Sequence, residues 1–291
     1  MDPNIVILAA GIGSRMRNTA AAHSTLDSRL REEAATIPKS LIGVGDHGRP
    51  LLDYVLYNAR ESGYRDVVIV VGEKDAEFRA HYGADDRGNK FHGLTISYAV
   101  QRIPEGRIKP LGTADALLQA LRTRKDWSGQ RFTVCNSDNF YSQHAFRLLL
   151  EDQHSSAMID YDRDALGVDH RRIEHFAVIQ KDQKGYLMDI IEKPTPEQIA
   201  RLTDPNGRVG VSMNIFRFTY DHVLPYLERV PLHPTRLEKD LPQAILLMLA
   251  DSDDAMMTIP LSEVVPDLTY QNDIQNVREY LHRAFPTFSM S

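Results

Sequence analysis

A glycine pair and two basic residues near the start of the chain have the types and the order that phosphate chemistry needs. The apolar segment 4–8 is followed by Gly11, Gly13 and Arg15, and Lys39 comes later. Glycines allow backbone N–H groups to approach phosphate oxygens closely, because no side chain intervenes. Arginine offers a planar fork to a phosphate, and lysine offers a compact point charge. The pattern indicates a loop that binds a polyphosphate.

This loop differs from the two best-known nucleotide-binding patterns. A dinucleotide-binding loop has a third glycine at the position that Met16 occupies, and no G-x-x-x-x-G-K-[ST] run is present. Taken alone, the loop is equally consistent with a glycine-rich turn beside two surface cations. The rest of the chain has to decide between these two interpretations.

The elements that would position these residues alternate along the chain. Segment 67–71 is apolar at every position, as expected of a strand with helices on both faces, and segment 51–62 has apolar residues at helical spacing. The first half therefore predicts a doubly wound α/β unit with ligands at the carboxyl ends of its strands, and an antiparallel or mixed addition follows from about residue 156. The predicted strands are 4–9, 40–44, 66–71, 94–99, 131–136, 156–161, 175–180, 187–191, 209–218 and 255–260. The predicted helices are 50–62, 75–82, 113–125, 142–152, 219–228, 238–250 and 271–285.

Other segments lack either period and are predicted to be mobile loops. In the first of them, Ser24 and Asp27 have the spacing of a helix-capping box, and Leu26 and Leu30 lie four apart. We therefore expect a short helix inside that loop. The predicted loops are 17–36, 83–93 and 102–111.

Composition restricts the class of protein. The chain has 291 residues, is 42% hydrophobic and 25% charged, and carries a formal charge of −6. These values are typical of a soluble globular protein and argue against a nucleic-acid-binding surface. Cys135 is the only cysteine, which excludes an internal disulfide and favours a reducing cytoplasm. The chain start lacks a basic n-region, and its apolar run is too short for export or for a bilayer span. We expect a cytoplasmic protein without membrane or nucleic-acid partners.

Five further motifs follow the glycine loop in a fixed order, and most of them come at predicted strand ends. With them the chain resembles the sugar-phosphate nucleotidyltransferases, also called nucleoside-diphosphate-sugar pyrophosphorylases, over residues 4 to about 275. Any one of the motifs is weak, but their order is specific. The six motifs are Leu8–Met16 with Pro38–Leu41, Gln101 with Pro110–Leu117, Asn136–Asn139, Ile191–Pro194, Leu237–Pro242 and Asp267–Ile274.

The resemblance implies a fold and a reaction. The fold would be a Rossmann-like, doubly wound mixed α/β sheet with an embedded β-rich sugar-binding subregion. A single domain over 1–291 would have an NTP-binding half of about 1–155 and a sugar-phosphate-binding half of about 156–291. In the Mg²⁺-dependent reaction, a sugar 1-phosphate oxygen attacks the α-phosphorus of an NTP and pyrophosphate leaves, so the protein has to neutralise charge and align two anions. These two small molecules would be the partners, and a homo-oligomer is left open.

The same resemblance assigns roles to residues of this sequence. Arg15 would hold the departing pyrophosphate, Lys39 would stabilise the α-phosphate and the transition state, and Gln101 would frame the base. The expected catalytic residues are Arg15, Lys39, Asp138 and Lys193. The expected nucleotide-binding residues are Leu8, Ala10, Gly11, Gly13, Gln101, Pro110 and Gly112. The expected sugar-phosphate-binding residues are Asn139, Glu192, Lys193 and Asn214, and the expected Mg²⁺ ligands are Asp138 and Asp267.

Several departures from the family pattern bear on the substrate. Segment 17–36 is longer than the family's and is expected to be a lid or a partner-binding insertion. The spacing from Gln101 to Pro110 is also longer, and Thr269-Tyr270 replaces the family's Gly-Thr. These departures predict activity on an acceptor other than a common hexose phosphate.

Three alternatives stay open on the sequence alone. A metal-dependent glycosyltransferase would carry a D-x-D motif, but segment 136–138 lacks its first aspartate. A cytidylyltransferase that acts on phosphocholine or another phosphomonoester would need the same charges. A non-catalytic regulatory subunit that binds a nucleotide or a sugar phosphate would explain the altered surroundings of Asp267. The base and the sugar are not determined by the sequence.

Overall fold

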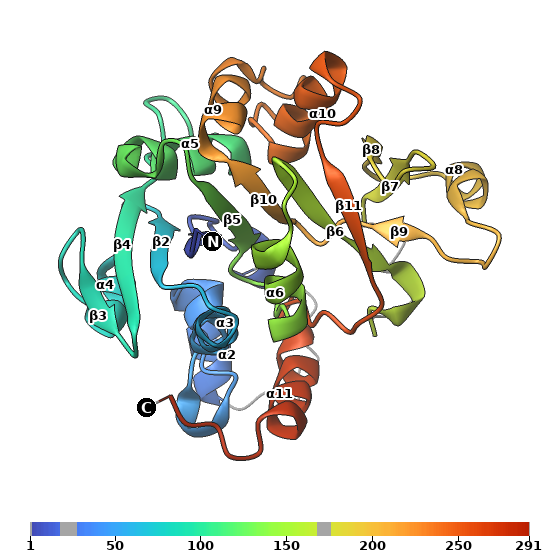
Figure 1. Cartoon of the computed structure of the whole chain (residues 1–291). Helices are drawn as coiled ribbons and strands as arrows, with labels where there is room; N and C mark the ends of the chain where they lie inside the picture. Colours follow the sequence, from blue (N-terminus) through green and yellow to red (C-terminus); the bar gives the residue numbers. More distant parts are fainter. Residues whose placement is uncertain (1, 18–27, 168–175, 291) are drawn as a thin grey trace.

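A mixed sheet of eleven strands forms the centre of the computed structural model, which describes residues 2–17, 28–167 and 176–290 (Figure 1). The strands are β1 (Asn4–Leu8), β2 (Asp66–Val71), β3 (Asn89–Phe91), β4 (Leu94–Val100), β5 (Arg131–Asn136), β6 (Ser156–Asp162), β7 (Val178–Lys181), β8 (Leu187–Ile191), β9 (Gly210–Val211), β10 (Ile215–Thr219) and β11 (Met257–Leu261). Their order is β3-β4-β2-β1-β5-β10-β6-β9-β7-β8, and β11 pairs with β6 outside this path.

The strands of the sheet change from parallel to antiparallel pairing at its middle. Strands β4, β2, β1 and β5 run parallel, whereas β10 is antiparallel to both β5 and β6. Leu8 at the end of β1 lies opposite Asn136 at the end of β5, so the carboxyl ends of these two strands open onto the same edge. The predicted doubly wound sheet with a mixed second half is confirmed.

Helices cover both faces of the sheet (Figure 1). In β1 the side chains alternate, so that Ile5 and Ile7 pack into one buried cluster and Val6 and Leu8 into the other. The first cluster includes buried residues of α2 (Ser28–Thr36), α3 (Leu51–Glu61), α6 (Gln143–Glu151) and α11 (Asp273–Ala284). The second includes residues of α5 (Thr113–Thr123), α9 (Tyr220–Arg229) and α10 (Leu241–Asp251). The described residues also include three short helices: α1 (Ser14–Arg17), α4 (Ala76–Tyr82) and α8 (Pro196–Leu202).

The predicted strand 40–44 is wrong. A 3₁₀ helix, Lys39–Leu41, begins after Pro38, and the chain then runs irregularly through Gly43. Leu41 and Ile42 are buried, so the apolar run that suggested a strand belongs to a packed loop. A Cβ atom at Gly43 would come within 2.7 Å of the Gly48 carbonyl oxygen, which explains the glycine in this crowded turn.

The predicted loop 83–93 contains a strand. β3 pairs with β4 as a hairpin, in which Phe91 lies opposite Leu94. The two turn residues His92 and Gly93 both have positive φ angles, 46° and 82°, as the favoured two-residue hairpin turn requires. Histidine is an unusual residue for such a turn, and it concealed the hairpin in the sequence.

Two further differences lie in the second half. The predicted strand 209–218 is interrupted between β9 and β10, where Asn214 has a φ of 56°. Helix α8 was not predicted, although Thr195 and Gln198 form a reciprocal capping box at its start. The other predicted strands and helices are confirmed, with ends that differ by three residues or fewer.

The predicted loops have mixed outcomes. The short helix expected within 17–36 is α2, while Ser24, Leu26 and Asp27 lie outside the described residues. Residues 102–111, all of them described, form neither helix nor strand. Among the described residues, no helix is both long enough and apolar enough to cross a membrane.

Candidate active site

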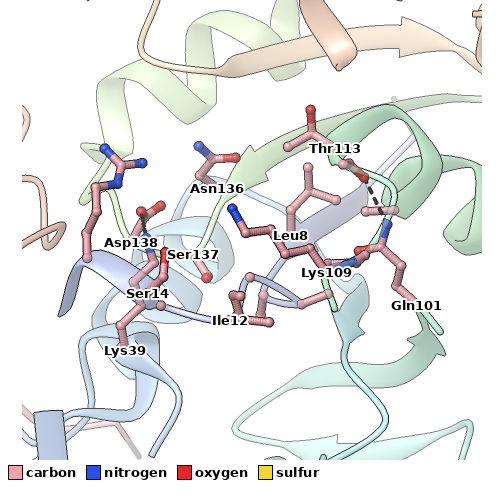
Figure 2. A pocket seen from close by; sticks show the side chains of 18 of the residues that line it. Leu8, Ile12, Ser14, Lys39, Gln101, Lys109, Thr113, Asn136, Ser137 and Asp138 are labelled. Atoms are coloured by element: carbon pink, nitrogen blue, oxygen red, sulfur yellow. Dashed lines mark hydrogen bonds and ion pairs between the residues drawn. The ribbon is translucent and has the colours of Figure 1, made fainter. Parts of the chain in front are cut away.

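A cavity of about 600 Å³ opens at the sheet edge where β1 and β5 end (Figure 2). Ten of the residues predicted from the sequence line it, although they come from five separate segments of the chain. The edge where parallel strands end is the usual place for ligands in sheets of this kind. The ten residues are Leu8, Ala10, Gly11, Gly13, Arg15, Lys39, Gln101, Pro110, Gly112 and Asp138.

The glycine loop leaves room for a ligand above its backbone. A Cβ atom at Gly11 would meet no protein atom within 4 Å, so protein packing does not require a glycine there. Gly13 has a φ of 61°, a conformation that glycine adopts without strain. Both glycines line the cavity, so their backbones border the space that an anion could occupy.

The two residues that distinguish this loop from a dinucleotide loop have different surroundings. Met16, at the position of the third glycine, is buried in the core and its carbonyl accepts a 3.0 Å hydrogen bond from the Gln271 side chain. Arg15 is exposed and lies over the ring of Tyr270, with 5.9 Å between the guanidinium carbon and the ring centroid. The methionine therefore anchors α1 while the arginine stays at the cavity.

Lys39 and Asp138 form an ion pair inside the cavity. The Lys39 ammonium contacts a carboxylate oxygen of Asp138, and their side chains are only 20% and 13% exposed (Figure 2). Asp138 follows the end of β5, whereas Lys39 comes from the 3₁₀ helix that replaces the predicted strand. A cation and a carboxylate thus meet beside the glycine loop, which is the charge pattern that a metal–polyphosphate complex needs.

The two predicted metal ligands lie on neighbouring backbone segments. Leu268 donates its N–H to the Asp138 carbonyl oxygen at 2.8 Å, and Asn139 pairs with Asp267 in a β-bridge. The Asp267 carboxylate accepts a 2.8 Å hydrogen bond from the Thr269 hydroxyl, and Thr269 lines the cavity although Asp267 does not. Within the described ranges no three His, Cys, Asp or Glu residues cluster as a metal site. The Asp138 carboxylate fits a hard divalent metal ion, which would take one or two carboxylates and complete its shell with phosphate oxygens and water.

Gln101 is held rigidly at the other end of the cavity. Its side-chain nitrogen donates to the Gly112 carbonyl at 2.9 Å and to the Asp115 carboxylate at 2.8 Å, which uses both amide hydrogens. Gly112 has a φ of 101°, and a Cβ atom there would lie 2.7 Å from the Lys239 carbonyl oxygen. Gly112 is therefore required by the fold, and Gln101 keeps only its carbonyl oxygen for a ligand.

The residues expected to bind the sugar phosphate do not line this cavity. Asn139 is buried beside Asp267, while Glu192, Lys193 and Asn214 are exposed. Lys193 and Asn214 both have left-handed backbones, with φ angles of 49° and 56°. In the structure these residues lie outside the space that the nucleotide-side residues enclose.

Two cavity-lining cations were missed in the sequence, Lys109 and Arg236. Lys109 extends across the cavity toward Asn136 and Leu8 (Figure 2). Arg236 donates to Glu192 at 2.7 Å and to Asp240 at 2.6 Å, and the hydrogen bond to Glu192, followed by that to Asp240, raises the pKa of Arg236 further above its usual value. Lys109 directly precedes the motif Pro110–Leu117, and Arg236 directly precedes the motif Leu237–Pro242. This adjacency is the sequence feature that could have identified both cations.

Comparison with known proteins links the chain to nucleotidyl transferases. The family model described as nucleotidyl transferase matches residues 27–269. The chain is 26% identical over 253 residues to the bifunctional protein GlmU of Staphylococcus haemolyticus (strain JCSC1435), which covers 87% of this chain and 46% of that protein. It is 28% identical over 228 residues to a glucose-1-phosphate adenylyltransferase of Anaeromyxobacter sp. (strain Fw109-5). This match covers 77% of this chain and 50% of the adenylyltransferase. The chain spans about half the length of these relatives.

A solved structure shares the fold. This chain superposes on the crystal structure of UDP-glucose pyrophosphorylase complexed with UDP-glucose with a TM-score of 0.70. The superposition covers 98% of this chain and 100% of the pyrophosphorylase chain. Sequence identity in this comparison is 15%, so the likeness establishes the Rossmann-like arrangement of the sheet and helices alone.

Proposed function

This chain belongs to the nucleotidyl transferase family, and from that premise we propose that it joins an NTP to a sugar 1-phosphate and releases pyrophosphate. One observation carries the proposal: the glycine loop, Arg15, Lys39 and Asp138 line a single cavity at the carboxyl ends of β1 and β5. Three of these features neutralise phosphate charge, and the fourth binds a metal. Neutralisation and alignment are what a reaction between two anions needs.

We assign the NTP to the glycine-loop side of the cavity. The N–H groups at Gly11 and Gly13 and the Arg15 guanidinium would hold the triphosphate, with Arg15 on the departing pyrophosphate. Leu8, Ala10, Pro110 and Gly112 would enclose the base and ribose, and the fixed carbonyl oxygen of Gln101 would accept from a base N–H group.

Asp138 would hold a divalent metal, specifically Mg²⁺, with Asp267 as the second carboxylate of the site. When bound, Mg²⁺ supplies charge neutralisation for the phosphate oxygens. Asp138 has Lys39 as its partner in the structure. We propose that the Lys39 ammonium turns from Asp138 to the α-phosphate as substrates bind, so that the same lysine stabilises the charge that develops in the transition state.

The acceptor would enter from the second half of the chain. Lys193 would pair with the sugar phosphate, and Glu192, Asn139 and Asn214 would hydrogen-bond to the sugar. An acceptor phosphate oxygen attacks the α-phosphorus, its new P–O bond forms as the bond to the pyrophosphate oxygen breaks, and the configuration at phosphorus inverts. Both halves, about 1–155 and about 156–291, act as one domain in this proposal, in the cytoplasm where both substrates are available.

The test is pyrophosphate release from the purified protein with Mg²⁺. UTP, dTTP, CTP, GTP and ATP are each combined with a panel of sugar 1-phosphates and with phosphocholine, and an Asp138→Asn variant runs in parallel. One productive pair that the variant and a chelator both abolish supports the proposal. Activity with phosphocholine alone would assign a different acceptor class. NTP binding without turnover across the panel would contradict an enzymatic role, and a nucleotidylated protein trapped without acceptor would contradict direct transfer.

A further inference from the structure

The described part of the long segment between Arg15 and Lys39 is a packed helix. Leu30 and Ala34 on one side of α2 are fully buried and belong to the same core cluster as Ile5 and Ile7 of β1. The charged residues of α2 include Arg29 and Glu33, which lie beside the buried positions on the helix surface, and we call this flank the polar side of α2. Because the apolar side of α2 is fixed in the core, the side chains on its polar side can hold a neighbouring segment of the chain in place.

The polar side of α2 holds one glycine by both of its backbone groups. Arg29 donates to the Gly43 carbonyl oxygen at 3.2 Å, and the Gly43 N–H donates to a Glu33 carboxylate oxygen at 2.8 Å. Arg29 and Glu33 also pair with each other at 2.7 Å. We call these three residues, Arg29, Glu33 and Gly43, the α2 clamp.

The residue type at position 43 fits this close contact. A Cβ atom on Gly43 would lie 2.7 Å from an Arg29 guanidinium nitrogen and 2.7 Å from the Gly48 carbonyl oxygen. Contacts that short do not occur for real Cβ atoms, so a side chain at position 43 would force the Gly48 backbone and the end of the Arg29 side chain to shift. The glycine lets the backbone lie directly against the two charged side chains.

The α2 clamp and the cavity act on the two ends of one short segment. Lys39 begins the segment and pairs with Asp138 in the cavity, whereas Gly43 ends it inside the clamp. The buried residues Leu41 and Ile42 connect the two ends. We propose that Arg29 and Glu33 are positioning residues that hold the Lys39 ammonium at the reacting phosphate, an inference that rests on the role proposed above for Lys39.

The exposure of Arg29 and Glu33 distinguishes a role in positioning Lys39 from a role in stabilising the fold. The Arg29 and Glu33 side chains are 47% and 23% exposed, and a pair this exposed adds little to the free energy of unfolding. A small displacement of a catalytic charge, in contrast, lowers a rate strongly: about 1 Å can cost roughly 10²-fold. Removal of Arg29 should therefore change kcat far more than the melting temperature.

The experiment compares Arg29→Ala with Arg31→Ala, an exposed arginine on the same helix. We expect Arg29→Ala to lower kcat by about 10- to 100-fold, with melting temperature and NTP KM near those of the parent, and Arg31→Ala to change none of them. In a Lys39→Ala background, Arg29→Ala should cause no further loss, because the lysine it positions is gone. Glu33→Gln, which keeps an acceptor oxygen for the Gly43 N–H, should retain more activity than Glu33→Ala.

Hydrogen exchange of segment 38–46 provides a readout that does not depend on turnover. Arg29→Ala should speed exchange there, and Arg31→Ala should not. Equal kcat values for the two arginine variants, additive losses in the Lys39→Ala background, or unchanged exchange would each overturn the positioning role. If the parent protein releases no pyrophosphate, the proposed function fails, while hydrogen exchange still decides whether the clamp orders the segment.

Discussion

The nucleotide side and the acceptor side of the molecule differ in how their expected residues are assembled. On the nucleotide side, ten residues from five segments line one cavity. On the acceptor side, Glu192, Lys193 and Asn214 are exposed and lie outside it. In the proposed reaction the first group would already surround the nucleotide, whereas the second group would reach the reacting atoms only through the bound acceptor or a movement.

Sheet order accounts for the difference. β1 and β5 are parallel neighbours, so loops that follow them open at the same edge. β8, which leads to Glu192, lies five positions from β5 in the strand order, and each step is about 4.8 Å. Arg236 spans part of this separation, because it lines the cavity and donates to Glu192.

The largest expected effect is on the nucleotide side. Lys39→Ala removes a preorganised cation beside Asp138, and we expect kcat for pyrophosphate release to fall by about 10²–10³-fold. Lys184→Ala, at an exposed turn between β7 and β8, is the control and should match the parent. A loss of less than about threefold in Lys39→Ala would show that the cavity charge is not used in the reaction, and the comparison between the two sides would lose its basis.

Arg236→Ala tests the connection between the two sides. Without its guanidinium, Glu192 loses a 2.7 Å partner, and we expect the sugar-phosphate KM to rise about tenfold, the effect of losing one charged hydrogen bond. The NTP KM should stay within about twofold. Arg229→Ala removes an exposed ion pair with Asp251 that includes neither Glu192 nor any residue lining the cavity, and it serves as the control.

A different change in the two KM values would contradict this assignment of Arg236. If Arg236→Ala raises the NTP KM and leaves the sugar-phosphate KM unchanged, Arg236 belongs to the nucleotide side and Glu192 is not part of the acceptor site.

Gly11→Ala is expected to have a moderate effect on nucleotide binding alone. The added methyl group meets no protein atom, so the melting temperature should not change, but it occupies space above the loop backbone. We expect the NTP KM to rise several-fold. Gly112→Ala should instead destabilise the fold. Gly112 has a positive φ, and the added Cβ atom would lie 2.7 Å from the Lys239 carbonyl oxygen, so we expect a loss of about 1–3 kcal/mol in the free energy of unfolding. Calorimetry and initial rates separate the two, and an unchanged KM in Gly11→Ala would place the phosphates elsewhere.

The sequence predicted those parts of the fold and site that depend on local pattern. Gly11, Gly13 and Asp138 directly follow parallel strands, so their position at one sheet edge follows from strand identity alone. The contribution of Arg236 could not be predicted, because it depends on how the chain after α9 folds back toward β8. The α2 clamp could not be predicted either, since Arg29 and Glu33 contact Gly43 through an irregular segment that the sequence suggested was a strand.

The smallest effect is expected at Asn214, whose left-handed backbone complicates the usual alanine substitution. Asn214→Ala puts a β-carbon in a conformation that costs about 1 kcal/mol or more, so lost activity could reflect the backbone alone. Asn214→Gly keeps that conformation and removes only the side chain. If the amide contacts the sugar at this exposed position, we expect the sugar-phosphate KM to rise about two- to threefold, as for one weak hydrogen bond of about 0.5 kcal/mol. A parent-like KM in Asn214→Gly, together with a lower melting temperature in Asn214→Ala, would mean that asparagine is present for its backbone conformation and that the acceptor binds without it.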